Sequence, residues 1–289
     1  MQIAYFPGCT LHARATDLDR SARAAAEMLG IRFVELSKWS CCGASFPTAG
    51  GNLMTLASPH RALAQASREG GNLITLCAIC YNVLKRTNHL VSNDVESQKK
   101  LAMFTDEDYS GQTRVVHLLE LLRDEVGLDR MRDRLVTTMR GLKVAPYYGC
   151  LLLRPQKEML LDDPDRPQIL ENFLESLGCQ VVDFPFKTEC CGSFLAVSAE
   201  EVATDMSHRI LEAAVGYGAE AVVGSCPLCQ FNLDNRQREM AGRYKGFRQI
   251  PVFYFTQLLA LGLGLEEGSI GMDQHFVDPR PVLRGKGLL

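Results

Sequence analysis

The stretch KTECCGS, residues 187–193, places two cysteines side by side, with a charged residue before them and a glycine after them. A second stretch, KWSCCGA at residues 38–44, carries the same Cys-Cys-Gly, again with a lysine three positions before the first cysteine. Adjacent cysteines cannot easily bond to each other, and a hydrophobic core has little use for two consecutive thiols. The recurrence therefore indicates a role that needs several thiols at one place.

The two stretches belong to two series of cysteines with matching spacing. In each series a single cysteine precedes the pair, and 34 residues separate the pair from a later C-x-x-C. The first series is Cys9, Cys41, Cys42, Cys77 and Cys80, and the second is Cys150, Cys190, Cys191, Cys226 and Cys229. Neighbouring segments match as well: IAYFPGC parallels VAPYYGC, and AAAEMLGIRFVEL parallels NFLESLGCQVVDF. The chain is therefore predicted to be a duplication, with one repeat at residues 1–140 and the other, with a C-terminal tail, at 141–289.

The two repeats differ in the loop after the single cysteine. This loop separates the single cysteine from the pair by 31 residues in the first repeat and by 39 in the second. The additional residues fall around RPQKEMLLDDPDRPQ, residues 154–168. The second repeat is thus expected to carry an insertion in its first connection.

Each repeat shows strand and helix patterns in alternation, which is typical of parallel β-α-β units. In the first repeat, apolar runs predict strands at 2–6, 31–36, 72–76 and 114–118, and helical patterns span 16–29 and 52–68. The expected fold class is α/β, with two pseudo-symmetric Rossmann-like repeats that each contain a parallel sheet. On this assignment every cysteine of the two series follows a strand. Because the carboxyl ends of parallel strands share one edge, five thiols should meet there in each repeat.

The charge and the apolar pattern exclude several classes of partner. A balance of 31 basic and 34 acidic residues gives a net charge of −3, which argues against binding to nucleic acid or an anionic membrane surface. The N-terminal stretch MQIAYFPGC does not resemble a signal peptide, and no run approaches the roughly 18 apolar residues of a membrane span. We expect a cytoplasmic protein.

Five thiols in each repeat favour iron–sulfur chemistry over the alternatives. Burial as apolar side chains does not require pairs or a C-x-x-C, and two disulfides per repeat would leave one thiol over and suit a cytosolic chain poorly. Structural zinc takes four ligands, usually at two C-x-x-C spacings, and a thioredoxin-like C-x-x-C would leave the pairs unexplained. Clusters of several irons accept more thiolates, and these soft ligands suit iron.

The repeated pattern resembles the cysteine-rich CCG domain family, and within it the catalytic iron–sulfur subunit of heterodisulfide reductases. The segments YFPGC, YYGCLLLRP, ECCGS and DPRPVLRGKG carry the resemblance, which extends over essentially the whole chain. It implies two noncubane [4Fe-4S] clusters, with the first series of five cysteines as ligands of one and the second series as ligands of the other. It also implies that the clusters, with no side chain assigned a catalytic role, cleave or form a disulfide such as that of coenzyme M and coenzyme B.

The resemblance further implies two partners in the same complex, one flavin- and iron–sulfur-containing and the other small and ferredoxin-like, besides the disulfide or thiol substrate. Two other functions stay open. One is the equivalent subunit of a sulfur-oxidising heterodisulfide-reductase-like complex that acts on lipoate-bound sulfur. The other is an electron-transfer subunit of a succinate-quinone or lactate-oxidising complex.

Three further residues are candidate contacts of the clusters or the substrate. His12 lies three positions after Cys9, and Lys38 and Lys187 recur at equivalent places before the two pairs. The alternative for each of them is an exposed loop residue with no role in the site. The remaining cysteine, Cys179, aligns with Ile31 on a predicted core strand and is expected to be a buried apolar side chain.

One more pair of segments, SPHRALAQA and MSHRILEAA, is also similar in the two repeats. The histidine and arginine that they share are expected on helices far from the cysteine edge, with a structural role.

Overall fold

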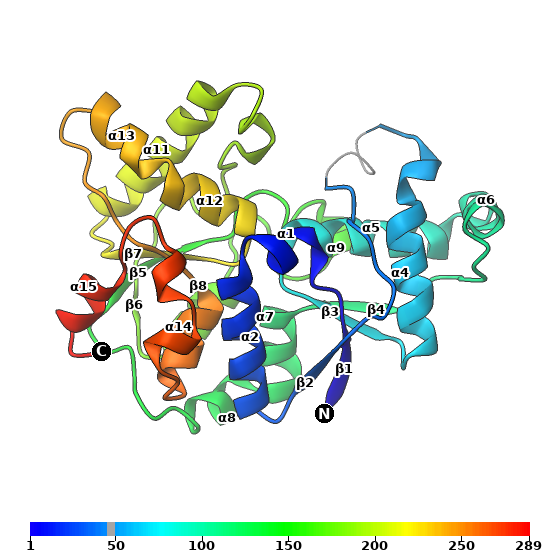
Figure 1. The fold of residues 1–289 in the computed structure, drawn as a ribbon, viewed down its shortest axis with the longest axis horizontal. Helices are drawn as coiled ribbons and strands as arrows, with labels where there is room; N and C mark the ends of the chain where they lie inside the picture. The colour runs from blue at the N-terminus through cyan, green and yellow to red at the C-terminus, as the bar shows by residue number, and fades with distance from the viewer. Residues whose placement is uncertain (45–49) are drawn as a thin grey trace.

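A computed structural model of the protein describes residues 1–44 and 50–289, and these form two parallel sheets of four strands each, flanked by helices (Figure 1). The strands of the first sheet are β1 (Gln2–Tyr5), β2 (Arg32–Glu35), β3 (Asn72–Thr75) and β4 (Arg114–His117). The strands of the second are β5 (Lys143–Tyr147), β6 (Gln180–Val181), β7 (Ala221–Gly224) and β8 (Val252–Tyr254). The orders, β2-β1-β3-β4 and β6-β5-β7-β8, are equivalent. The predicted α/β class with two parallel sheets in a repeated layout is confirmed.

Helices flank both sheets. The first sheet is accompanied by α1 (Gly8–Ala13), α2 (Thr16–Met28), η1 (Leu53–Leu56), α4 (Ala57–Arg68), α5 (Ala78–Asn93), α6 (Val95–Thr105), α7 (Leu118–Leu121), η2 (Leu122–Val126) and α8 (Leu128–Arg132). The second is accompanied by α9 (Gln156–Met159), α10 (Ile169–Ser176), η3 (Ser193–Leu195), α11 (Glu200–Gly216), α12 (Pro227–Asn235), α13 (Gln237–Arg243), α14 (Phe255–Gly262), η4 (Glu267–Ser269), η5 (Met272–Gln274) and α15 (Arg280–Arg284). Among the described residues, no helix has both the length and the apolar character to cross a membrane.

Two glycines end the equivalent helices α2 and α10 in the same way. Gly30 and Gly178 have φ angles of +79° and +88°, a region that favours glycine because it has no Cβ. The next residue, Ile31 or Cys179, donates its backbone N–H to a carbonyl in the last turn of the helix, at 2.8 Å and 3.1 Å respectively. This helix end is a Schellman motif, and it turns the chain directly into β2 or β6.

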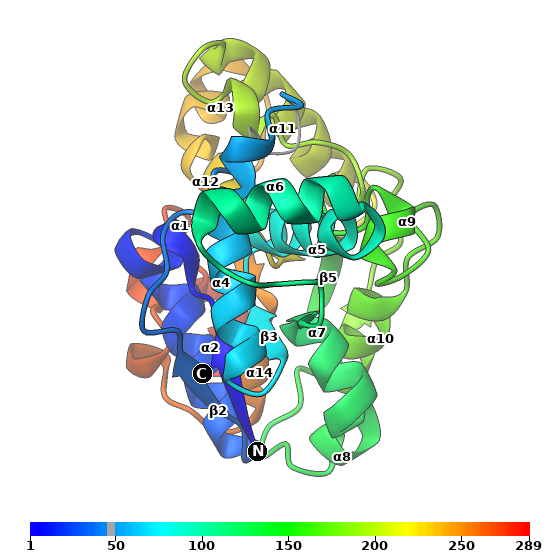
Figure 2. The same cartoon turned by 90° about the vertical axis from the view of Figure 1, so that its right-hand side faces the viewer.

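The two halves of the chain are joined by helices of each repeat that pack against helices of the other. The first-repeat helix α2 packs against α14 of the second repeat, and the second-repeat helix α10 packs against α7 and α8 of the first. Figures 1 and 2 both show α14 beside α2. A buried hydrogen bond of 2.7 Å between the hydroxyls of Ser21 and Thr256 joins α2 to α14. This reciprocal packing relates the repeats by a pseudo-twofold arrangement and fixes how their strand ends face each other.

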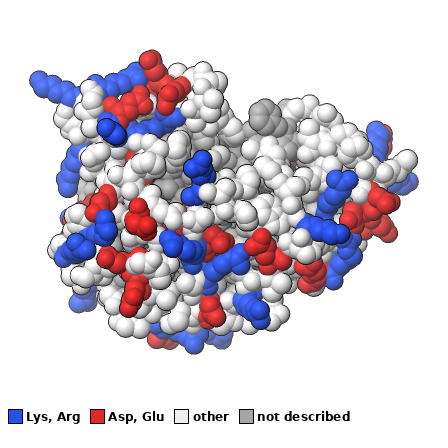
Figure 3. Space-filling view, in the orientation of Figure 1, with Lys and Arg blue, Asp and Glu red and all other residues white. Residues whose placement is uncertain are grey.

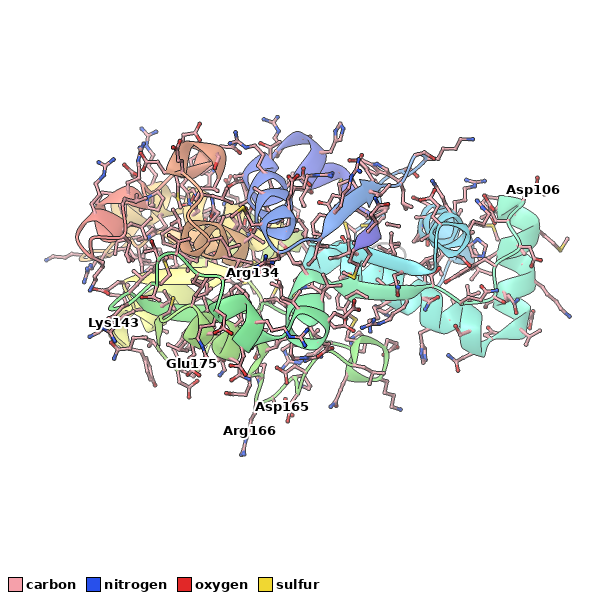
Figure 4. All side chains as sticks on the ribbon, turned by 90° about the horizontal axis from the view of Figure 1, so that it is seen from below. Asp106, Arg134, Lys143, Asp165, Arg166 and Glu175 are labelled. Carbon is pink, nitrogen blue, oxygen red and sulfur yellow. The ribbon has the colours of Figure 1, made fainter. Side chains whose placement is uncertain are left out.

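The predicted insertion of the second repeat folds onto the first repeat. Its helix α9 packs against α5, where the buried Asn82 donates its amide to the carbonyl oxygens of Leu151 at 2.8 Å and Arg154 at 2.6 Å. The far side of the insertion faces solvent, because Asp165 and Arg166 project outward from it in Figure 4. The insertion is therefore a second contact between the repeats.

Candidate functional site

The ten repeat cysteines lie beyond the carboxyl ends of strands, at corresponding places in the two halves. Cys9 lies in α1, directly after β1, and Cys150 follows β5. The two pairs follow β2 and β6, and each C-x-x-C begins a helix, with Cys77 capping α5 and Cys226 capping α12. In both sheets the strand order reverses between the strand before the single cysteine and the strand before the C-x-x-C. In α/β folds this reversal opens a crevice for ligands.

The five thiols of the first repeat, here the first cysteine group, come together across three loops. Cys9 Sγ lies 3.4 Å from Cys41 Sγ, and Cys42 Sγ lies 3.5 Å from Cys80 Sγ. Cys42, Cys77 and Cys80 are buried, whereas Cys9 and Cys41 are exposed. The group therefore has an inner end that is shielded from water and an outer end that is open to it.

The five thiols of the second repeat, the second cysteine group, repeat this arrangement. Cys191 Sγ lies 3.5 Å from Cys229 Sγ, which matches the pair formed by Cys42 and Cys80. Cys150 and Cys190 at the outer end are half-buried, and the remaining three thiols are buried. The second group is thus more enclosed than the first.

A glycine allows the backbone to approach the thiols in each group. Gly8 and Gly149 precede the two single cysteines and have φ angles of +74° and +66°. A Cβ on Gly8 would lie 2.7 Å from Cys80 Sγ, and one on Gly149 would lie 3.1 Å from Cys229 Sγ. Each glycine is required by its backbone conformation and by the space that the sulfur occupies.

Hydrogen bonds within the groups favour thiolates at three positions. The thiol of Cys80 lowers the pKa of Cys42 to about 7, and the thiol of Cys150 lowers the pKa of Cys190 to about 6. The pKa of Cys226 lies well below its ordinary value because Cys229 hydrogen-bonds to it. Thiolates are the form in which cysteines bind metals, so the groups are prepared for ligation.

The two cysteine groups meet at their inner ends. Cys77 of the first group and Cys226 of the second share a hydrogen bond, which raises the pKa of Cys77 and helps to lower that of Cys226. Both residues are buried and stand at the starts of equivalent helices. The pseudo-twofold packing therefore brings the two sets of thiols into direct contact across the boundary between the repeats.

The donors present fit iron–sulfur clusters. Soft thiolates are the ligands that such clusters take, and N–H groups also point at the sulfurs. Gly43 N lies 3.4 Å from Cys41 Sγ, and Gly192 N lies 3.3 Å from Cys190 Sγ. Such N–H donors stabilise thiolates and tune the potential of a bound cluster. Within residues 1–44 and 50–289, no three metal-binding side chains converge as the ligands of a single ion would.

The other candidate contacts lie at the margins of the groups. His12 is exposed on α1, and its ring packs edge-on against that of Trp39, with 5.7 Å between the ring centroids. Lys38 is exposed, and its backbone N–H is held by the side-chain oxygen of Gln65 at 3.3 Å. Both side chains are exposed, and among the contacts of the described residues neither bonds to a thiol of the first group.

Lys187 has a different environment from Lys38. Its ammonium group lies 2.8 Å from Glu171 and 2.9 Å from Asp183, and the first of these carboxylates is buried. Its carbonyl accepts hydrogen bonds from the backbone N–H groups of Tyr148 and Gly149. The charge of Lys187 is thus balanced by two carboxylates, and its backbone positions the loop that carries Cys150.

Cys179 lies apart from both groups. It occupies the position directly before β6, as Ile31 does before β2, and both side chains are buried. Burial raises the pKa of Cys179 to about 12, so it remains a neutral thiol.

Three residues that support the Cys-Cys pairs do not stand out in the sequence. Ser58 Oγ donates to the carbonyl of Cys41 at 2.8 Å, and Ser207 Oγ donates to that of Cys191 at 3.0 Å. Asn232 also donates to the Cys191 carbonyl, at 2.9 Å. The similarity of SPHRALAQA and MSHRILEAA is the signal that could have found the two serines. The serines precede the shared histidine and arginine in these segments, and each donates to a carbonyl of a Cys-Cys pair.

Comparisons with known proteins agree with this architecture. Residues 3–85 and 144–234 match the cysteine-rich domain CCG. The 8-methylmenaquinol:fumarate reductase membrane anchor subunit of Wolinella succinogenes is 32% identical over 96% of this chain and 97% of its own length. A subunit of the ferredoxin:CoB-CoM heterodisulfide reductase of Methanosarcina mazei is 28% identical, over 96% of this chain and 94% of its own length.

A solved structure supports the fold. The crystal structure of a hypothetical protein from Helicobacter pylori matches 95% of this chain and 51% of that one with a TM-score of 0.76, at 14% sequence identity. The sequence matches cover both cysteine groups. The chain therefore belongs to the family of proteins built from the cysteine-rich CCG domain, and it carries two copies of that domain.

Proposed function

We propose that this protein is the catalytic iron–sulfur subunit of a heterodisulfide-reductase-type complex, in which it cleaves or forms a disulfide such as that of coenzyme M and coenzyme B. The contact between Cys77 and Cys226 carries this proposal, because it brings two complete sets of five thiols to one place. The Methanosarcina mazei relative, which aligns over nearly its whole length, supports the reaction class.

The two cysteine groups would each hold one noncubane [4Fe-4S] cluster. A disulfide takes up two electrons, and each cluster, when bound, would supply one of them. A sulfur radical released between the two electrons would be destructive, so two neighbouring sites on one substrate suit the reaction better than one. The role of the chain is to hold both sets of thiolates side by side and to keep water from their inner ends.

The partners follow from the same assignment. The electrons must come from outside this chain, and we propose as their source two partners in the cytoplasm, one flavin- and iron–sulfur-containing and the other ferredoxin-like. The exposed outer end of the first cysteine group, with Cys9 and Cys41, gives these electrons a route to enter.

Anaerobic purification with metal and sulfide analysis tests the cofactor assignment. The chain should contain about eight irons and eight acid-labile sulfides, and the purified complex should reduce a heterodisulfide with a low-potential donor. An iron content near four, or stoichiometric zinc, would contradict the two-cluster assignment. Full iron content without disulfide turnover would contradict the reaction alone.

A second function is favoured by one observation. The Wolinella succinogenes relative, a subunit of an 8-methylmenaquinol:fumarate reductase, has the higher identity of the two relatives described above. An electron-transfer subunit would carry electrons between a quinol and a partner flavoprotein, without binding a disulfide. Reduction of the clusters by a menaquinol analogue, with no turnover of any disulfide, would select this function.

A further inference from the structure

A pocket of 400 Å³ opens between the two repeats and borders both cysteine groups. Thr10 in its wall follows the single cysteine of the first group, and Ser193 follows the Cys-Cys-Gly of the second. Pro227 and Leu228, also in the wall, lie inside the second C-x-x-C. We call it the inter-repeat pocket. A molecule bound there touches the loops that carry thiols of both repeats.

Most of the inter-repeat pocket is apolar. Its wall includes Ala15, Val197, Phe231 and Phe276, and the last three are exposed apolar side chains. The space-filling view shows few charged side chains over α1 and α12 in the middle of the molecule (Figure 3). Pockets that bind small molecules have this character, an apolar lining with a few placed polar groups.

The pseudo-twofold arrangement predicts an equivalent space beside α5, but the insertion fills it. Phe231 on α12 corresponds to Asn82 on α5, and Asn82 instead holds the loop at Leu151 and Arg154. Tyr81 beside it contacts the carbonyl of Met159 in α9 at 3.5 Å. The connection after the single cysteine is shorter in the first repeat, so the corresponding space beside α12 remains open as the inter-repeat pocket.

Two buried carboxyl groups line this pocket, one from each repeat. Asp17 belongs to the first turn of α2 and is 5% exposed, and Asp234 belongs to α12 and is 2% exposed. Asp234 accepts backbone hydrogen bonds from Phe276 at 2.8 Å and Val277 at 3.0 Å. The hydrogen bonds that lower the pKa of Asp17 come only from backbone N–H groups at the start of its own helix.

Neither acid is paired with a basic side chain within 4.0 Å among the ion pairs of the described residues. Burial raises the pKa of Asp17 to about 6, with Asp273 adding to this and Arg20 opposing it. Burial likewise raises the pKa of Asp234 to about 6, and the charge of Asp17 adds to it. Two acids of this kind hold their protons up to about pH 6, higher than an ordinary carboxyl group, and can release them into the pocket.

Other charged or titratable groups face the same space. Arg14 lines the pocket from the end of α1 and is exposed. Tyr254 lines it from β8, and burial raises its pKa well above the ordinary value, so it stays protonated. His275 lies between the wall residues Gln274 and Phe276 but is not itself part of the wall. It is bonded to Gln257, and burial lowers its pKa to about 4, so it stays neutral.

The acids are specific to this pocket and do not follow from the duplication. In the repeat alignment Asp234 corresponds to Lys85, and Asp17 corresponds to Asp165. Lys85 lies over the ring of Tyr81, and Asp165 projects into solvent from the insertion (Figure 4). The equivalent place near α5 therefore lacks the acid pair.

We infer that the inter-repeat pocket receives the disulfide substrate and that the carboxyl groups of Asp17 and Asp234 donate the two protons of its reduction. This inference rests on the proposed function. The S–S bond breaks as two electrons arrive from an external low-potential donor through the iron–sulfur sites. Each sulfur takes one proton from one carboxyl group, which gives two thiols and two carboxylates. Water at the exposed mouth beside Arg14 returns the protons.

The test compares the assembled complex containing wild-type chain, Asp17→Asn, Asp234→Asn or the double variant. Glu27→Gln is the matched control, because it removes an exposed carboxylate from the same helix as Asp17. Three quantities are measured for each: iron and sulfide content, the rate of cluster reduction without substrate, and disulfide turnover from pH 5 to pH 9. The infrared C=O band of protonated carboxyl groups is followed across the same pH range.

For the wild type we expect turnover to fall as the pH rises through about 6, where the carboxyl groups lose their protons. Either single variant should keep its iron and its cluster reduction rate but lose turnover by about a hundredfold. In the double variant the fall with pH should disappear, and each substitution should remove one carboxyl band. Asp234→Glu should restore part of the activity, and Glu27→Gln should match the wild type.

The outcomes distinguish a failure of the proposed function from a failure of the inference about proton donation. A wild-type complex that turns over no disulfide contradicts the proposed function, and the inference about proton donation fails with it. A wild-type complex that is active, with Asp17→Asn equally active and its pH profile unchanged, overturns the inference alone. Asp234→Asn could loosen the C-terminal segment, because Asp234 accepts hydrogen bonds from Phe276 and Val277. Asp17→Asn still tests the inference in that case, because within the described part of the chain Asp17 makes no hydrogen bond to another element.

Discussion

Single residues show how differently a thiol can be used in this chain. The ten grouped cysteines lie within reach of other sulfurs, and several are held as thiolates by hydrogen bonds. Cys179 has only apolar surroundings as the cause of its raised pKa. The same side chain therefore belongs either to a group of neighbouring thiols or to the apolar core, according to its surroundings.

Replacement of Cys179 by valine should have little effect. Because Cys179→Val nearly preserves the volume of a buried apolar side chain, the free energy of unfolding should fall by no more than about 1.5 kcal/mol. Iron, sulfide and turnover should equal those of the wild type. Urea denaturation and metal analysis measure both quantities, and loss of a cluster in this variant would mean that Cys179 is a ligand.

The titration of Asp17 should also change how the free energy of unfolding depends on pH. Its pKa is about 6 in the folded protein and 3.8 as the ordinary value, so the unfolded chain loses this proton first as the pH rises. Asp17 therefore contributes stability that is present at low pH and is lost as the pH rises through about 6, and the neutral Asp17→Asn lacks this contribution. Between pH 5 and pH 8, the free energy of unfolding of the variant should rise by about 1.4 kcal/mol relative to that of the wild type. Chemical denaturation at the two pH values measures this difference, and a constant difference would show that Asp17 titrates normally.

At the scale of elements, the insertion that carries α9 acts as a clasp between the repeats. Asn82 on α5 provides the two donors that hold its first loop, and Arg123 at the end of the α7 region donates to the carbonyl of Leu161 at 2.8 Å. The insertion closes the space beside α5, and the corresponding space beside α12 stays open. Eight additional residues thus make two equivalent halves structurally unequal.

Removal of the Asn82 amide should weaken this clasp. Asn82→Ala leaves two half-buried carbonyl groups without their donor, which should lower the free energy of unfolding by about 2 kcal/mol. Asn93→Ala is the control, because Asn93 lies on the same helix, is exposed and bonds only within that helix. Denaturation measures the stability, and hydrogen exchange should show faster exchange in residues 151–160 of Asn82→Ala alone. Equal stability in both variants would show that the clasp contributes nothing.

The whole molecule is arranged as two equivalent halves whose functional ends touch. The exchange of α2 and α10 between the halves turns the two strand edges toward each other, and the contact of Cys77 with Cys226 is the result. Under the proposed function the two cysteine groups would share one substrate. In a relay, by contrast, substrate would reach only one group and the other would pass electrons on.

The pair and the relay make different predictions for the outer cysteines. Cys41→Ser should damage the first group and Cys190→Ser the second, and under the paired arrangement each should abolish disulfide turnover. Each variant should still retain about four irons in the intact group, and that group should still accept an electron. Metal analysis, electron paramagnetic resonance and turnover assays measure these properties. Turnover that survives in one of the two variants would favour the relay.

The sequence by itself determined the local structure and the inventory of thiols. Apolar runs located the strands at 2–5, 32–35, 72–75 and 114–117 to within a residue or two, and Gly30 marked the end of α2. The convergence of the cysteines was predictable because parallel strands necessarily share one carboxyl edge. These features depend on residues that are close in sequence, or on a rule that holds for every parallel sheet.

Only the tertiary structure decided how the halves face each other. The contact of Cys77 with Cys226, the open inter-repeat pocket, and the nearness of Asp17 to Asp234 join residues that are far apart in the chain. They arise because α2 packs on α14, and because the insertion fills one of two equivalent spaces. Such contacts depend on the shapes of packed surfaces. A local pattern of apolar and polar residues shows which surfaces are buried, but it does not show which surface each of them meets.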